Sequence, residues 1–265
     1  MASMRRAAIL RSFARPPWWA LFAAAGCGLL LSTYGTATAT VPLLCRSSAI
    51  SELTATNAAD AVALAIALNP PGPLMAGWAL MLLAMMPPLL AAPLMHVWRS
   101  SLPQRRQGSL ALFLIGYCAV WMAAGSPLIV LAVTLHMLLG GVSLWVTFSL
   151  VVVALLWSAS PWQRAALNRG HRLQRISLFG WAWGRDCARF GVVHALWCVA
   201  SCWPWMLAAA SAEDWHLAFM IAAGAIMLGE RLAPAEPPRW RWPVLILALD
   251  PRPAWAPLQD LLRHG

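Results

Sequence analysis

Six apolar stretches, separated by more polar segments, constrain this chain more than any other feature. They cover about Trp18–Tyr34, Leu74–Val97, Ser109–Met137, Val142–Trp157, Phe190–Ser211 and Leu217–Leu232. Each is near the ~20 residues that a helix needs to cross a bilayer. Only 11% of the residues are charged, about half the fraction of a typical soluble domain. The sequence therefore predicts an all-α, polytopic transmembrane helix bundle of about six spans with interfacial helices.

The arginines predict how these spans are oriented. All 19 basic residues are arginine, and every one except Arg46 lies before span one, between spans two and three, between spans four and five, or at or beyond the end of span six. Cytoplasmic segments of membrane proteins carry such an excess of positive charge. We therefore expect a multi-pass protein of the bacterial cytoplasmic membrane with both termini in the cytoplasm. The same pattern accounts for the net charge of +10 without a nucleic acid partner.

The predicted organisation has three parts. A basic cytoplasmic N-terminus covers residues 1–17, the helix bundle covers residues 18–232, and a tail rich in Pro, Arg and Trp covers residues 233–265. We expect an interfacial helix over Ala58–Leu68, and a loop from Ser160 to Asp186 that lies along anionic headgroups. Span one also resembles a secretory signal that could be cleaved. Its retention is favoured because cleavage would leave an odd number of spans.

Span five concentrates the residues with the most chemistry. It reads FGVVHALWCVASCWPWMLAAAS and carries His194, Cys198 and Cys202, each four residues from the next. Four residues advance an α-helix by about 6 Å and rotate it by about 40°, so the three side chains share one face. Imidazole and thiolate bind zinc and copper, and thiolate favours the softer copper(I). This spacing predicts a metal site, with copper(I) favoured and zinc as the alternative.

Span two supplies a second group of soft donors. Met81, Met85 and Met86 precede Pro87 and Pro88, which interrupt the backbone hydrogen bonds of a helix. Methionine is also an ordinary packing residue. The opposite chain direction and matching depth of spans two and five nevertheless predict that they face each other and share one metal ion. We expect His194, which lies closer to the cytoplasm, to be either the fourth ligand or an exit ligand.

These two stretches together resemble a bacterial family of predicted metal-binding integral membrane proteins of unassigned function. The resemblance in span two rests on Trp78, Met81, Met85, Met86 and Pro88, and in span five on His194, Cys198, Cys202 and Trp203. Glu230-Arg231 is similar to the acidic–basic pair that closes the last main span in the family. The resemblance implies metal binding, with Trp78, Trp203 and Glu230 around the ligands or at the membrane interface.

One departure from the family pattern bears on metal transfer. The family often has two cysteines in the loop after span four, where this chain has Ala166 and Gly170. If those cysteines pass metal to cytosolic acceptors in relatives, that step lacks its ligands here. Another membrane subunit or a metal carrier remains an expected partner, together with the lipid bilayer.

Three other functions remain open on the sequence alone. A structural or assembly subunit of a larger membrane complex would use the cysteines only for packing. A membrane thiol redox protein would cycle a Cys198–Cys202 disulfide, but a regular helix aims the two sulfurs poorly for bridging. Haem ligation is weaker still, because His194 has no evident partner at its depth. No phosphate-binding loop, hydrolase triad or carboxylate pair occurs, so a non-enzymatic role is favoured.

Overall fold

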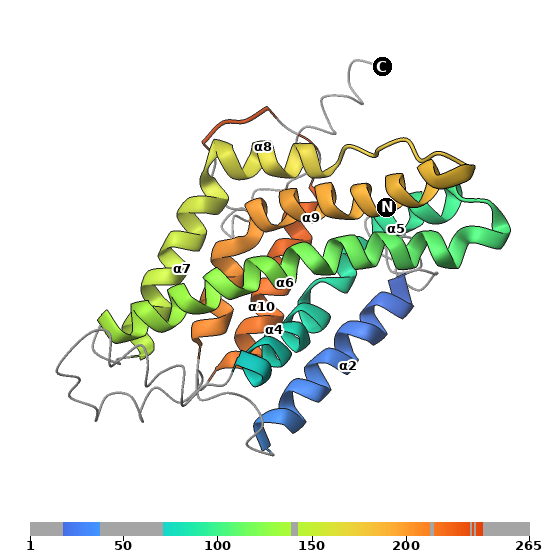
Figure 1. Ribbon diagram of the computed structural model, residues 1–265. Coiled ribbons are helices and arrows are strands. Elements are labelled where there is room, and N and C mark those ends of the chain that lie inside the picture. Colours follow the sequence, from blue (N-terminus) through green and yellow to red (C-terminus); the bar gives the residue numbers. More distant parts are fainter. Residues whose placement is uncertain are drawn as a thin grey trace, which may run out of the picture.

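The computed structural model describes residues 18–37, 71–138, 143–212, 215–233, 235 and 237–240. All elements in this part of the chain are helices, which confirms the all-α class (Figure 1). They are α2 (Trp18–Ala37), α4 (Pro71–Met85), η3 (Pro87–Leu90), α5 (Ala91–Ser100), η4 (Pro103–Arg105), α6 (Arg106–Leu138), α7 (Ser143–Ala159), α8 (Pro161–Gly170), α9 (Gly180–Ser211) and α10 (His216–Leu232). The predicted N-terminal segment 1–17, the helix over Ala58–Leu68 and most of the tail lie outside the described residues.

The predicted loop from Ser160 to Asp186 is largely helical, which corrects that expectation. Ser160 caps α8 by accepting a hydrogen bond from the Gln163 backbone N–H at 3.2 Å, and Pro161 occupies the first turn, where its missing N–H costs nothing. Helix α9 begins at Gly180, ten residues before the predicted start of span five at Phe190. The start of span five was predicted where the sequence becomes hydrophobic. Helix α9 instead begins in the more polar residues that precede that point.

The proline pair breaks span two as the sequence indicates. Helix α4 ends at Met85, a 3₁₀ turn covers Pro87–Leu90, and α5 follows. The two halves are bent by 58° relative to each other. Because prolines donate no backbone hydrogen bond, the break falls where Pro87 and Pro88 stand.

Two helices are long and apolar enough to cross a membrane, Pro103–Ala132 and Gly180–Ser211. Two bent pairs, Gly72–Met85 with Pro87–Ser100 and Trp145–Ala159 with Pro161–Gly170, would raise the number to four if each formed one span. Trp18–Thr33 is a shorter apolar helix. The described residues thus contain two to four candidate spans, fewer than the six that the sequence predicts.

Helix α6 is the principal neighbour of α9, and glycines on both helices explain why. A Cβ atom at Gly116 would collide with the Ala188 carbonyl oxygen, and one at Gly191 would collide with the Phe113 carbonyl oxygen. Glycines therefore let the two backbones approach closely, as small residues do between membrane helices.

Helix α4 has different neighbours. It packs mainly against α2, α6 and α10, and the described residues show no extensive backbone interface between α4 and α9. Spans two and five, which were predicted to face each other, therefore share no extensive helix–helix interface. Their side chains meet only within the common core of the bundle.

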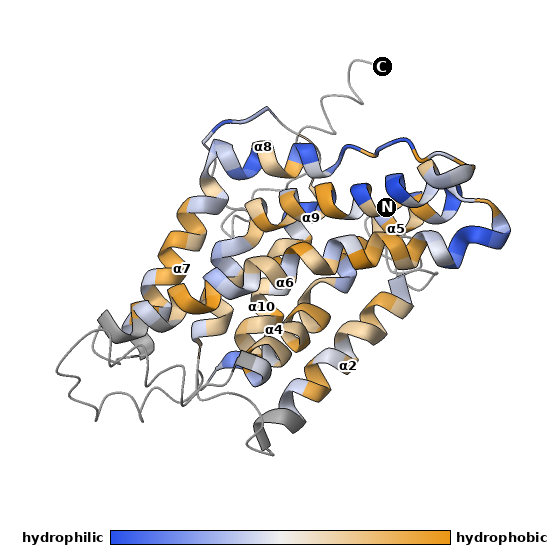
Figure 2. Ribbon diagram, in the orientation of Figure 1, coloured by the Kyte–Doolittle hydropathy of each residue, from blue (hydrophilic) through white to orange (hydrophobic). Residues whose placement is uncertain are grey.

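Hydrophilic residues gather at one end of the bundle, on α8, the first turns of α9 and the start of α6, whereas the helix middles are apolar (Figure 2). Arg106, Arg169 and Arg185 lie in these segments, and Arg105 directly precedes α6, so predicted cytoplasmic arginines from different loops share one end. Trp162 and Trp181 are 64% and 88% exposed at the same end.

Candidate metal centre

Helix α9 presents His194, Cys198 and Cys202 to the protein core. Their exposed fractions are 3%, 1% and 3%, so the shared face that the four-residue spacing predicts is buried. The surrounding cluster consists mainly of apolar residues from α4, α6, α9 and α10. Neither thiol takes part in a disulfide.

The closest side-chain partner of Cys198 comes from α6. The Tyr117 hydroxyl lies 3.3 Å from Cys198 Sγ, and both residues are buried. Cys202 Sγ lies 2.8 Å from the Cys198 carbonyl oxygen, to which its thiol donates.

Tyr117 was not among the predicted site residues, although one signal for it is present in the sequence. A tyrosine hydroxyl in an apolar span needs a polar partner when it is buried, and thiols are among the few available. By contrast, the neighbouring Cys118 is exposed and takes no part in this cluster.

The three methionines of the predicted site lie in the same buried core as the two cysteines. Met81, Met85 and Met86 are 4%, 2% and 2% exposed and belong to one cluster with Cys198 and Cys202. Met85 and Met86 stand directly before the proline break. The structure thus places the soft donors of both predicted motifs in one apolar interior, although the two helices are not direct neighbours.

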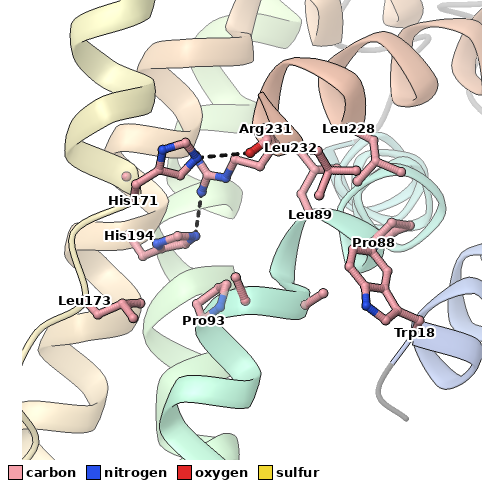
Figure 3. A pocket seen from close by; sticks show the side chains of 13 residues that line it. Trp18, Pro88, Leu89, Pro93, His171, Leu173, His194, Leu228, Arg231 and Leu232 are labelled. Atoms are coloured by element: carbon pink, nitrogen blue, oxygen red, sulfur yellow. Dashed lines mark hydrogen bonds between the residues drawn. The ribbon is translucent and has the colours of Figure 1, made fainter. Parts of the chain in front are cut away.

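His194 is hydrogen-bonded to an arginine through one of the two ring nitrogens that could bind a metal. Its Nε2 lies 2.7 Å from Arg231 Nη2 (Figure 3). A guanidinium can only donate, so Nε2 accepts this bond and the proton of the neutral ring resides on Nδ1. Nδ1 has no partner. His194 Nε2 is therefore unavailable to a metal unless Arg231 moves away.

Glu230 and Arg231 point to different partners. Glu230 is buried and accepts a hydrogen bond from Gln163 Nε2 of α8 at 2.6 Å, whereas Arg231 bonds His194 of α9. These two neighbouring residues therefore bond to different helices and not to each other. The pair instead ties the end of α10 to two other helices.

The two predicted surrounding tryptophans have structural contacts. Trp78 donates its indole N–H to the Trp121 carbonyl oxygen at 3.0 Å, and Gly125 provides the space that its ring occupies. Trp203 packs edge-to-face on Trp157, with ring centroids 5.7 Å apart. It belongs to the periphery of a second core cluster around Val146 and Leu207, apart from the sulfur atoms.

The described residues contain no group of three or more His, Cys, Asp or Glu side chains arranged to hold a metal ion. His194 is thus not gathered with the two thiols into a conventional three-ligand site. Any metal site built on Cys198 and Cys202 must draw on thioether or other donors.

Fold and site together define a class of protein: a helical bundle with membrane-length apolar helices, in which thiols and thioethers belong to one buried core. A family model for PpoB2, described as a copper chaperone, matches residues 75–250. The chain belongs to this family. No curated protein and no solved structure matches it.

Family membership supports a copper-handling role and copper as the metal. It also agrees with the metal-related family that the two motifs indicated. The match covers α4 to α10, which include every residue of the candidate site.

Proposed function

We propose that this protein is an integral membrane copper chaperone that binds copper(I) inside the bundle and passes it on. In this proposal Cys198 and Cys202 supply the thiolates, and Met85 with Met81 or Met86 supplies thioether. The ion is the cargo of the protein and not the centre of a reaction. A copper carrier or another membrane subunit would be the partner that exchanges it.

One observation carries the proposal: two thiols and three methionines share a single buried core in a member of a copper chaperone family. Thiolate and thioether are soft ligands that select copper(I), whereas structural zinc sites use cysteine and histidine. Copper(I) therefore fits the donors better than zinc does.

The charge balance predicts how binding proceeds. Two bare thiolates in an apolar interior would be costly without a cation, and the Cys202 thiol donates to the Cys198 carbonyl oxygen. The metal-free protein therefore holds thiols, and copper binding releases protons.

His194 has a secondary place in this proposal. Because Arg231 occupies Nε2, His194 becomes a ligand only after Arg231 releases it. We assign it to the exit side of the site, one helical turn from Cys198 toward the arginine-rich end of the bundle.

The six-span topology with both termini in the cytoplasm is part of the proposal. It is supported by the hydrophilic segments that gather at one end of the bundle (Figure 2) and by helices that coincide with all six predicted apolar stretches. Single-cysteine labelling in intact cells tests it at Arg172, which is exposed, and at Ala55. Labelling of an Arg172→Cys variant from outside the cell would overturn the orientation.

Copper stoichiometry of purified protein tests the site. The full chain in mild detergent under reducing conditions should bind one copper(I), and the Cys198→Ser/Cys202→Ser variant should bind none. Cys118→Ser is the matched control, because this cysteine is exposed on the same bundle. Met85→Leu, which conserves volume, should weaken binding and leave the fold intact.

Two results would contradict the proposal. Full copper occupancy in the double serine variant would leave the structural or assembly subunit as the better function. A reversible Cys198–Cys202 disulfide with a defined potential would favour thiol redox chemistry.

A further inference from the structure

The buried charges of the bundle do not balance within the described residues. Arg164, Glu230 and Arg231 are all buried, so two cations and one carboxylate lie in the interior. Glu230 accepts a hydrogen bond from Gln163 at 2.6 Å and interacts electrostatically with Arg164, so these two charges offset each other. The positive charge of Arg231 is left without a balancing anion.

No carboxylate pairs with Arg231 in the part of the chain that the structure describes. That part contains two acidic residues, Asp186 and Glu230, and the ion pair found there joins Asp186 to Arg185. The Arg231 side chain donates instead to His194 Nε2 at 2.7 Å (Figure 3). A buried guanidinium without an anionic partner is costly, so an anionic group that forms nearby would be stabilised by it.

Arg231 lies close to the two thiols. His194, which accepts its hydrogen bond, stands one helical turn before Cys198 on α9. The centroid of the His194 ring is 6.2 Å from that of Tyr117, whose hydroxyl lies 3.3 Å from Cys198 Sγ. The charge of Arg231 accordingly interacts with both Cys198 and Cys202. The guanidinium is therefore within electrostatic reach of the proposed copper ligands.

The net charge of the loaded site depends on the metal. Two thiolates carry two negative charges and copper(I) carries one positive charge, so their complex is a monoanion, and neutral thioethers do not change this. Zinc carries two positive charges and forms a neutral complex with the same two thiolates. Because an uncompensated charge is costly in an apolar interior, only the copper(I) complex needs a counter-ion.

We propose that Arg231 is the counter-ion of the bis-thiolate copper(I) complex and thereby selects a monovalent over a divalent metal ion. This inference rests on the proposed function, because it takes Cys198 and Cys202 as the ligands. On binding, copper stays copper(I) and the two thiol protons leave to solvent. The attraction acts through space, so Arg231 can keep its hydrogen bond to His194 while the metal is bound at the thiolates.

Metal selectivity tests the proposal. Competition with chromophoric chelators measures the affinity of the full-length protein in detergent for copper(I), under reducing conditions, and for zinc. Arg231→Gln should lower the copper(I) affinity by about tenfold or more, because an attraction between opposite charges in the protein interior is lost, and should change the zinc affinity by less than about threefold. Arg231→Lys, which keeps the charge, should retain most of the copper(I) affinity.

Two further variants support the comparison. Arg172→Gln is the matched control, because it removes an equal charge from an exposed position and should leave both affinities unchanged. If Arg231→Gln does not fold, Arg231→Leu takes its place, since an apolar side chain leaves no unpaired donor in the core. Thermal unfolding in detergent shows which variants keep the fold.

Three outcomes would overturn the proposal while the wild-type protein still binds copper at its cysteines. They are an unchanged copper(I) affinity in Arg231→Gln, equal losses of copper(I) and zinc affinity in that variant, and an Arg231→Lys variant as weak as Arg231→Gln. Failure of the proposed function looks different, because then the wild type binds no copper(I) or the Cys198→Ser/Cys202→Ser variant retains it.

Discussion

Gly191→Ala should separate α6 from α9 and thereby disturb the thiol cluster. The new Cβ would overlap the Phe113 carbonyl oxygen and lie 3.1 Å from the Tyr117 backbone nitrogen. Both obstacles are backbone atoms, so no side-chain rotation relieves the overlap and α6 itself must shift. Overpacking of this kind costs about 1–3 kcal/mol.

A matched control isolates that packing cost. Replacing glycine by alanine inside a helix also lowers backbone entropy in the unfolded chain, which by itself stabilises by up to about 1 kcal/mol. Gly224→Ala carries the same gain in α10, where a Cβ would meet nothing within 4 Å. The difference in unfolding free energy between the two variants should therefore be about 1–3 kcal/mol.

Thermal unfolding of the full chain in detergent measures this difference, at roughly 2–4 °C in Tm per kcal/mol for a chain of this size. A second readout is specific to the site. Because Gly191 lies near Tyr117, a shift of α6 should lengthen the 3.3 Å contact between Tyr117 and Cys198 and speed labelling of Cys198 by a thiol reagent. Equal Tm values for the Gly191 and Gly224 variants would refute the close-packing argument.

Three further predictions follow from individual contacts. Tyr117→Phe should lower the free energy of unfolding by about 0.5–1.5 kcal/mol, the net value of one hydrogen bond. Denaturant titration measures this loss, and an unchanged midpoint would show that the hydroxyl contact to Cys198 contributes nothing to stability. Copper(I) affinity, measured by competition with a chromophoric chelator, should fall as pH falls, because protons compete with the metal for thiolates; affinity independent of pH would argue against thiolate ligands. Glu230→Ala should cost about 1–3 kcal/mol by leaving the buried Gln163 amide unpaired, whereas Glu230→Gln should retain most of the stability, and equal losses would contradict this account of the 2.6 Å bond.

The sequence predicted the helices well because hydropathy and helical spacing are local properties. The six apolar stretches all coincide with helices, and Pro87 and Pro88 break span two where backbone donors are missing. The burial of His194, Cys198 and Cys202 on one face likewise follows from their spacing on a helix that packs in a core. Helix ends were less well predicted, since α9 extends into polar sequence that hydropathy excludes.

The partners of those residues were decided only by the tertiary structure. The hydropathy of a helix indicates that it is buried, but it does not indicate which helix it packs against. Helices α6 and α9 are neighbours because Gly116 and Gly191 allow their backbones to approach closely. That choice brings Tyr117 to Cys198 across 81 positions in the chain. Arg231 likewise reaches His194 from 37 residues away. Such pairings depend on how helices cross in three dimensions, which no local pattern in the sequence encodes.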